Sequence, residues 1–233
     1  MQTLVEAFLQ ALRLVTTFDP AVVEIARLSL EVTLTAVVIS AVVGIPLGAW
    51  FALTTFSGRR ILTALIYTGM GLPPVVVGLV VYLFLSRSGP LGDLGWLFSF
   101  EAMVVAQSII ATPLILGVTM SSVMAIPYEL RLQLRSLGAT GWQTTWAVLW
   151  EARFGVIVGL VAGFGSIISE VGAVMLVGGN IEGRTRVLTT AIVLETRQGK
   201  FDVALALGII LLTLSFVSNF ALVLLQQRTG AAR

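Results

Sequence analysis

The sequence predicts an all-α, polytopic membrane protein with about five transmembrane helices, and three observations lead to this fold class. The 233-residue chain is 57% hydrophobic and 11% charged, with a mean hydropathy of +1.00, whereas a soluble domain is about 45–50% apolar. Five segments have the roughly 20 apolar residues that a helix needs to cross a bilayer. A polar, basic, helix-patterned insert separates the third of these segments from the fourth.

The chain opens with an amphipathic segment, residues 1–20, that we interpret as an interfacial helix ending near Pro20. An ordinary start to the first membrane helix is the alternative. The segment shows neither a basic leader nor a small-residue cleavage site, so we expect no removable signal peptide. The predicted spans then follow within a single membrane domain, residues 1–233, at 28–54, 61–86, 101–125, 154–178 and 203–226.

Several glycines and prolines lie within these predicted spans. Glycines four residues apart let another backbone approach one helix face closely, and they are Gly44 with Gly48, and Gly155 with Gly159 and Gly163. A proline inside a span removes a backbone donor, which is tolerated only against protein or a water-filled cavity. The prolines in question are Pro46, Pro73, Pro74 and Pro113. Such broken helices are common in transporters, with a simple kink as the alternative at each position.

The insert, residues 127–152, is predicted to form a bent pair of surface helices. In the first helix, Pro127 and Glu129 suit the first turn, and Gly138 suits a left-handed position that ends it. An apolar stripe with arginines on another face comprises Leu130, Leu134 and Leu137, beside Arg131 and Arg135. A plain connector would need only about two to eight residues. We therefore interpret the insert as a docking element.

The second helix of the insert opens at Thr140, which has capping-box spacing to Gln143. Three tryptophans share one of its faces, as tryptophans at a bilayer interface do. They are Trp142, Trp146 and Trp150.

Residue types exclude most chemistry. The chain contains no Cys and no His, which removes disulfides, thiolate chemistry, imidazole metal ligands and the usual general base. The single lysine, Lys200, precedes Phe201, so the G-x-x-x-x-G-K-[ST] phosphate loop does not occur. A net charge of +2 does not favour nucleic acid as a partner. We expect no enzyme activity, no catalytic or metal site and no cofactor in this chain, with any ATP hydrolysed by a partner.

Orientation follows from the basic residues of the loops. Seven Lys and Arg residues fall on each side of the five-span topology. The inner set lies close to the membrane ends in short loops, whereas the outer set includes several residues of the long loop 179–202. We therefore predict the N-terminus outside and the C-terminus in the cytoplasm.

At the insert, Leu137-Gly138-Ala139-Thr140 followed by Trp142 resembles the cytoplasmic EAA loop of permease subunits of binding-protein-dependent ABC importers. The Glu-Ala-Ala of that family is replaced here by Leu132-Gln133-Leu134, and its later Leu-Pro by Trp150-Glu151. Further strings resemble molybdate and tungstate permeases, closest to the tungstate branch. They occupy residues 29–36, 44–48, 71–78, 85–92, 170–180 and 185–192.

The resemblance implies the type I ABC importer permease fold and a transport function. It implies a homodimer in the cell inner membrane, surrounded by lipid, with two copies of an ATP-binding subunit that hold ATP and Mg and an oxyanion-binding protein outside. The substrate would be tungstate or a similar oxyanion, with molybdate as the alternative. The residues implied in coupling to the ATPase are Leu134, Arg135, Leu137, Gly138, Ala139, Thr140 and Trp142.

Glu170 is the one acid deep in the fourth span, and an ionisable group there marks function by default. Because a carboxylate repels an oxyanion, we expect it to stabilise a gate or pair helices, with the pathway wall as the alternative. Gly178, Gly179 and Asn180 end that span. Without side chains on the two glycines, backbone N–H groups are able to face an anion there. An ordinary helix-terminating turn is the alternative. The predicted pathway or gate residues are Pro73, Pro74, Ser169, Glu170, Gly178, Gly179 and Asn180.

Two other classes compete with an ABC permease. A secondary transporter needs its own coupling-ion site, usually several acids or an inverted repeat, and the sequence has one deep acid and no evident repeat. A non-transporting membrane scaffold would also be compatible with a docking loop.

Overall fold

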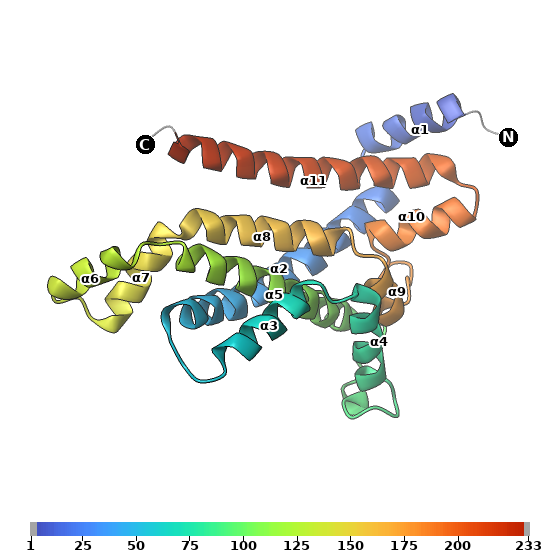
Figure 1. Cartoon of the computed structure of the whole chain (residues 1–233). Coiled ribbons are helices and arrows are strands. Elements are labelled where there is room, and N and C mark those ends of the chain that lie inside the picture. Colours follow the sequence, from blue (N-terminus) through green and yellow to red (C-terminus); the bar gives the residue numbers. More distant parts are fainter. Residues whose placement is uncertain (1–3, 231–233) are drawn as a thin grey trace. The chain divides into compact units, whose positions relative to one another are not determined.

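The computed structural model describes the backbone of residues 4–230 and the side chains of residues 5–224. Every regular element in this part of the chain is a helix, as predicted (Figure 1). In chain order the elements are α1 (Leu4–Thr16), α2 (Pro20–Leu53), α3 (Arg59–Met70), α4 (Pro74–Leu85), the short 3-10 helix η1 (Gly92–Leu94), α5 (Phe100–Met124), α6 (Tyr128–Ser136), α7 (Gly141–Glu151), α8 (Arg153–Ile168), α9 (Gly172–Gly178), α10 (Leu188–Arg197) and α11 (Phe201–Gly230).

Three of the described helices, α2, α5 and α11, are each long and apolar enough to cross a membrane. The number rises to five if α3 with α4, and α7 with α8, each count as one bent span. The first span begins earlier than residue 28, because α2 starts at Pro20. The Asp19 carboxylate there accepts hydrogen bonds from the backbone N–H groups of Ala21 and Val22, at 3.0 and 3.3 Å, and so caps the helix.

The segment 154–178, expected as one span, is two helices. Helix α8 ends at Ile168, and α9 starts at Gly172 after a three-residue break. With a rise of about 1.5 Å per residue, the 16 residues of α8 extend less than the roughly 30 Å thickness of the hydrocarbon core.

The chain divides into two compact units. The first unit comprises Met1–Ala36, Pro73–Ser108 and Gly165–Ser218, and the second comprises Val37–Leu72, Ile109–Phe164 and Asn219–Arg233. Helices α2, α5, α8 and α11 each pass from one unit into the other.

In the second unit, glycines bring three helices against α5. A β-carbon placed on Gly48 of α2 would lie 2.7 Å from the carbonyl oxygen of Leu116, and one on Gly155 of α8 only 2.0 Å from Ser122 Oγ. Similar close contacts occur at Gly44, Gly69, Gly159 and Gly163. The close helix approach predicted for both sets of spaced glycines is thereby confirmed.

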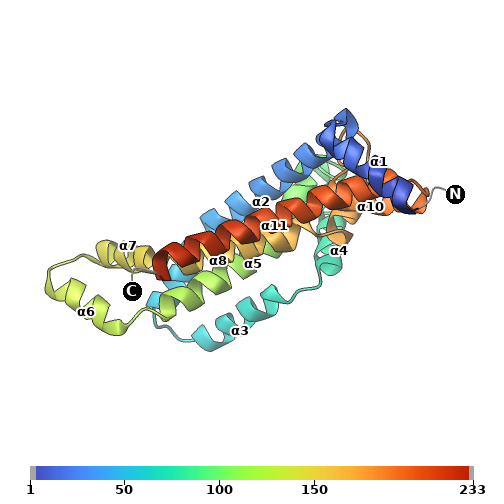
Figure 2. The same cartoon turned by 90° about the horizontal axis from the view of Figure 1, so that it is seen from above.

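The first unit has its own apolar core, which comprises Val22, Leu188, Ala191 and Leu207. A buried hydrogen bond of 2.7 Å, donated by the backbone N–H of Leu188 to Ser29 Oγ, ties the start of α10 to α2. Helices α4 and α9 lie side by side in this unit (Figures 1 and 2). These contacts position the first group of predicted site residues.

Candidate functional site

Pro73 and Pro74 begin a helix. Pro74 is the first residue of α4, where a proline lacks only an N–H that no helix partner would accept. The Pro73 carbonyl accepts hydrogen bonds from the N–H groups of Val76 and Val77, at 2.9 and 3.3 Å. The break between α3 and α4 therefore occupies the three residues before Pro74.

Ser169 and Glu170 form the break between α8 and α9. Ser169 Oγ donates to the carbonyl oxygens of Gly165 and Ser166, at 2.8 and 3.2 Å. The Glu170 carboxylate accepts a 3.0 Å hydrogen bond from the backbone N–H of Ala173. It thus acts as a local cap for the start of α9, where a negative charge also favours the positive end of the helix dipole.

The link from Glu170 to another helix is made by its backbone. Thr189 Oγ1, on α10, donates a 2.8 Å hydrogen bond to the Glu170 carbonyl oxygen. This hydrogen bond joins α10 to the main chain of Glu170, whereas the carboxylate bonds within the start of its own helix, α9. The gate-stabilising role expected of the Glu170 side chain stays a prediction.

The two breaks meet where α4 packs against α9. A β-carbon on Gly78 would lie 2.5 Å from Ala173 Cα, and one on Gly172 would lie 2.4 Å from Val75 Cγ2. The structure thus brings Pro73 and Pro74 near Ser169 and Glu170 through backbone-to-backbone packing. Gly78 and Gly172 were not predicted from the sequence as site residues, although both occur in the strings that carried the family resemblance.

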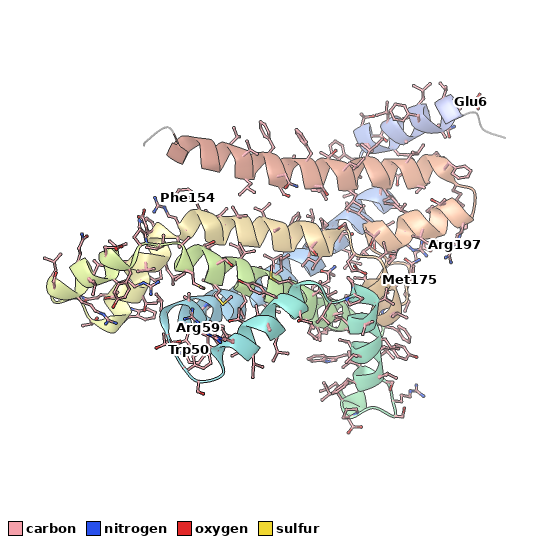
Figure 3. All side chains as sticks on the ribbon, viewed as in Figure 1. Glu6, Trp50, Arg59, Phe154, Met175 and Arg197 are labelled. Carbon is pink, nitrogen blue, oxygen red and sulfur yellow. The ribbon has the colours of Figure 1, made fainter. Side chains whose placement is uncertain are left out.

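Gly178, Gly179 and Asn180 lie beyond the other end of the α4–α9 contact, at the C-terminus of α9. Gly179 has φ 70° and Asn180 has φ 53°. The N–H of Gly179 donates to the Met175 carbonyl at 3.1 Å, and Thr185 Oγ1 donates to the Gly178 carbonyl at 2.5 Å. This is the geometry of the alternative, a helix-terminating turn, since the Gly179 N–H already has an acceptor. Figure 3 shows Met175 on this short helix.

Close packing explains both glycines of that turn. A β-carbon on Gly178 would lie 2.8 Å from Met103 Sδ, and one on Gly179 would lie 2.8 Å from Phe98 Cδ1. The backbone N–H of Phe98 also donates to the Val177 carbonyl at 2.9 Å.

The second group of predicted residues lies in the α6–α7 loop, which belongs to the second unit. Gly138 has φ 83°, and its N–H donates to the Arg135 carbonyl at 3.0 Å, while that of Ala139 donates to the Leu134 carbonyl at the same distance. Thr140 and Gln143 form both hydrogen bonds of the predicted capping box, at 2.8 and 3.3 Å. The predicted pair of capped helices is confirmed.

The tip of this loop is exposed and apolar. Leu137 is 85% exposed and Trp142 is 75% exposed, and the Trp142 and Trp146 rings stack with centroids 6.4 Å apart. On the opposite face of α7, Thr144 and Val148 are buried. Large exposed apolar side chains next to a rigid turn are typical of a surface that another protein or the lipid covers.

Three arginines give the base of the loop a positive charge. Burial lowers the pKa of Arg131; Tyr128 opposes this shift, and the neighbouring Arg135 and Arg59 lower the pKa further. Arg131 also donates to the Val123 carbonyl at 3.4 Å, which joins α6 to the end of α5. Arg59 lies at the start of α3 (Figure 3). A partner that docks here would match this surface with acidic groups.

The described residues form apolar helices of spanning length, helix breaks that are packed against protein, and an exposed, apolar α6–α7 loop, features that are common in the membrane subunits of transporters. The chain belongs to the family described as binding-protein-dependent transport system inner membrane component, whose model matches residues 44–231. It is therefore a multi-pass membrane protein of the ABC importer permease class, as the resemblance implied.

Several relatives are similar over most of their length. A probable anion ABC transporter permease of Haloferax volcanii is 45% identical over 82% of this chain and 85% of its own. The tungstate uptake permease TupB of Peptoclostridium acidaminophilum is 40% identical over 97% of this chain and 100% of its own. TupB of Campylobacter jejuni is 32% identical, with 92% and 90% covered.

Solved structures agree in fold. A chain of the inward-facing MetNI methionine ABC transporter has a TM-score of 0.73 at 19% identity, with 90% of this chain and 98% of that chain covered. A chain of a bacterial alginate ABC transporter, solved in complex with a periplasmic protein, has a TM-score of 0.72 at 21% identity, with 89% and 78% covered. The predicted fold is confirmed.

Proposed function

We propose that this chain is the permease subunit of an ABC importer that moves tungstate, or a closely similar oxyanion, into the cytoplasm. The observation that carries the proposal is the 40% identity with a tungstate uptake permease over essentially the whole of both chains. The ModB molybdenum permease of Escherichia coli is only 29% identical, and a CysW sulfate permease of Synechococcus elongatus is 27% identical. This order favours tungstate over molybdate.

The other subunits of the transporter are proposed from the same similarity to tungstate uptake permeases. Two copies of this chain form the pathway, two ATP-binding subunits dock on their α6–α7 loops, and an oxyanion-binding protein docks outside. ATP and Mg bind to the ATPase subunits, because the sequence of this chain has no phosphate loop. The N-terminus faces outside and the C-terminus faces the cytoplasm.

The conformation of the α6–α7 turn supports the docking role proposed for this loop. The left-handed turn at Gly138 and the capping box at Thr140 fix the direction of Leu137 and Trp142, both of which are exposed. A docked ATPase would therefore transmit force to α5 and α8 through two short, capped helices. The arginines beside Arg131 add electrostatic selectivity for an acidic groove.

The gate is formed by the paired half-helices α4 and α9. Their breaks, before Pro74 and at Ser169–Glu170, separate them from α3 and α8, so that the pair is able to tilt without unwinding a longer helix. Backbone contact at Gly78 and Ala173 keeps the pair together. The Glu170 cap preserves the start of α9 during this movement.

Reconstitution tests the proposal. The purified chain alone should bind no ATP, whereas proteoliposomes that contain it with its ATPase and binding protein should accumulate labelled tungstate only with ATP on the ATPase side. Unlabelled tungstate should compete better than molybdate. Uptake driven by a sodium or proton gradient would replace the proposal with a secondary transporter.

A further inference from the structure

The first unit contains a cavity of about 360 Å³ that neither the gate nor the coupling loop uses. It is lined by the end of α1 and the α1–α2 connection, the first turns of α2, the loop after α9, the end of α10, the α10–α11 connection and the start of α11. Its volume falls in the range of about 300–1,000 Å³ that is usual for binding pockets.

Acidic groups dominate the lining. They are Asp19, Glu24, Glu182 and Glu195, against the cations Arg186 and Lys200.

Three of the four acids already have a role. Asp19 caps α2, and the Glu182 carboxylate lies 3.3 Å from Arg186. Glu195 has a side chain only 10% exposed, and its carboxylate lies 3.7 Å from Lys200 Nζ. That distance is longer than the roughly 2.7–2.9 Å of a strong charge-assisted hydrogen bond, so the charge of this buried acid is weakly compensated.

Glu24 is the acid that remains. In the part of the chain that the structure describes, no hydrogen bond or ion pair engages it, and its side chain is exposed at the cavity. Its Oε1 lies 3.9 Å from the position that a β-carbon of Gly183 would take. Because Gly183 has no side chain, a ligand is able to approach the Glu24 carboxylate from that side.

Apart from Gln198, the uncharged side chains of the lining are apolar, and they include Leu14, Ile25, Leu28 and Val203. A lysine or arginine side chain combines an apolar stem with a cationic head and so matches both parts of this cavity. A second cation would also compensate the charge of Glu195.

We propose that this cavity receives a lysine or arginine side chain of the extracytoplasmic binding protein and so forms a docking point on this permease. The inference rests on the proposed function, whose topology places the α1–α2 and α10–α11 connections on the outer side. Charge complementarity is the reason to choose a cationic protein side chain, since the acids outnumber the cations by four to two.

A neutral substitution with a matched control tests the proposal. The complex with its ATPase is placed in nanodiscs, and its affinity for the purified binding protein is measured at low and moderate salt. Glu24→Gln should weaken binding by about tenfold at low salt and flatten the salt dependence. Asp93→Asn, at an exposed acid of η1 outside the cavity, should bind like the wild type. Equal affinity of Glu24→Gln and wild type would overturn the proposal.

Crosslinking identifies the occupant. Because the chain lacks cysteine, a single Gln198→Cys in the cavity lining can carry a maleimide-linked benzophenone, with Asp93→Cys as the control. Capture of a binding-protein segment that contains an exposed lysine or arginine, from position 198 and not from 93, supports the proposal. Capture of lipid alone, or of a segment without a cation, contradicts it.

Measurements on the wild-type complex test the proposed function separately from the role of the cavity. If the wild-type complex neither binds the binding protein nor takes up oxyanion, the proposed function is wrong. If the wild type does both and the cavity variants behave like it, only the role of the cavity is wrong.

Discussion

At the scale of single residues, Glu170 shows how an acid in an apolar segment is accommodated. Its carboxylate caps α9 through the N–H of Ala173, so the acceptor atom matters more than the charge. Glu170→Gln keeps an acceptor oxygen, whereas Glu170→Ala loses the cap, worth about 0.5–2 kcal/mol. We predict that basal ATPase activity of the reconstituted complex rises more in the Ala variant than in the Gln variant. Equal effects of both, confined to transport, would instead assign Glu170 to the pathway wall.

Gly78 is the residue on which the α4–α9 contact depends. Gly78→Ala places a β-carbon 2.5 Å from Ala173 Cα and should force the helices apart, at a cost of about 1–3 kcal/mol. We expect a lower melting temperature of the detergent-solubilised protein. Gly208→Ala is the matched control, because a β-carbon on Gly208 of α11 meets open space. A Gly78→Ala protein as stable as this control would show that the contact is looser than described.

At the scale of elements, the α6–α7 loop depends on one left-handed glycine. Gly138→Ala, at φ 83°, should strain the turn by about 1–2 kcal/mol and misdirect Leu137 and Trp142. We predict normal membrane insertion but reduced stimulation of ATPase activity by the loaded binding protein. In Gly141→Ala the β-carbon meets open space, so stimulation should persist. Undiminished stimulation in Gly138→Ala would remove the loop from the coupling path.

The membrane topology of the whole chain can be tested with single cysteines. The absence of native cysteine allows Gln133→Cys in α6 and Asp93→Cys in η1 to report the side of the membrane separately. A membrane-impermeant maleimide should label position 133 only from the cytoplasmic side and position 93 only from outside. Labelling of both from the same side is incompatible with the five-span arrangement and with the proposed docking sites.

Local features could be predicted from the sequence because neighbouring residues cause them. The left-handed turn at Gly138 and the capping box at Thr140 depend on backbone angles and hydrogen bonds within a few residues. The break before Pro74 follows from the missing N–H of a proline. The break at Ser169–Glu170 was not predicted, because an apolar run that contains one acid is equally compatible with a continuous span.

The membrane class, the pair of capped helices α6 and α7 and the family could be predicted from the sequence alone, since hydropathy, capping and motif strings are properties of contiguous residues. The fold was needed to show which helices the glycines bring together, that Thr189 of α10 bonds to the Glu170 carbonyl, and that Glu24 and Glu195 share a cavity. These features depend on contacts between segments far apart in the chain. Hydropathy and periodicity carry no information about which distant partner a residue meets.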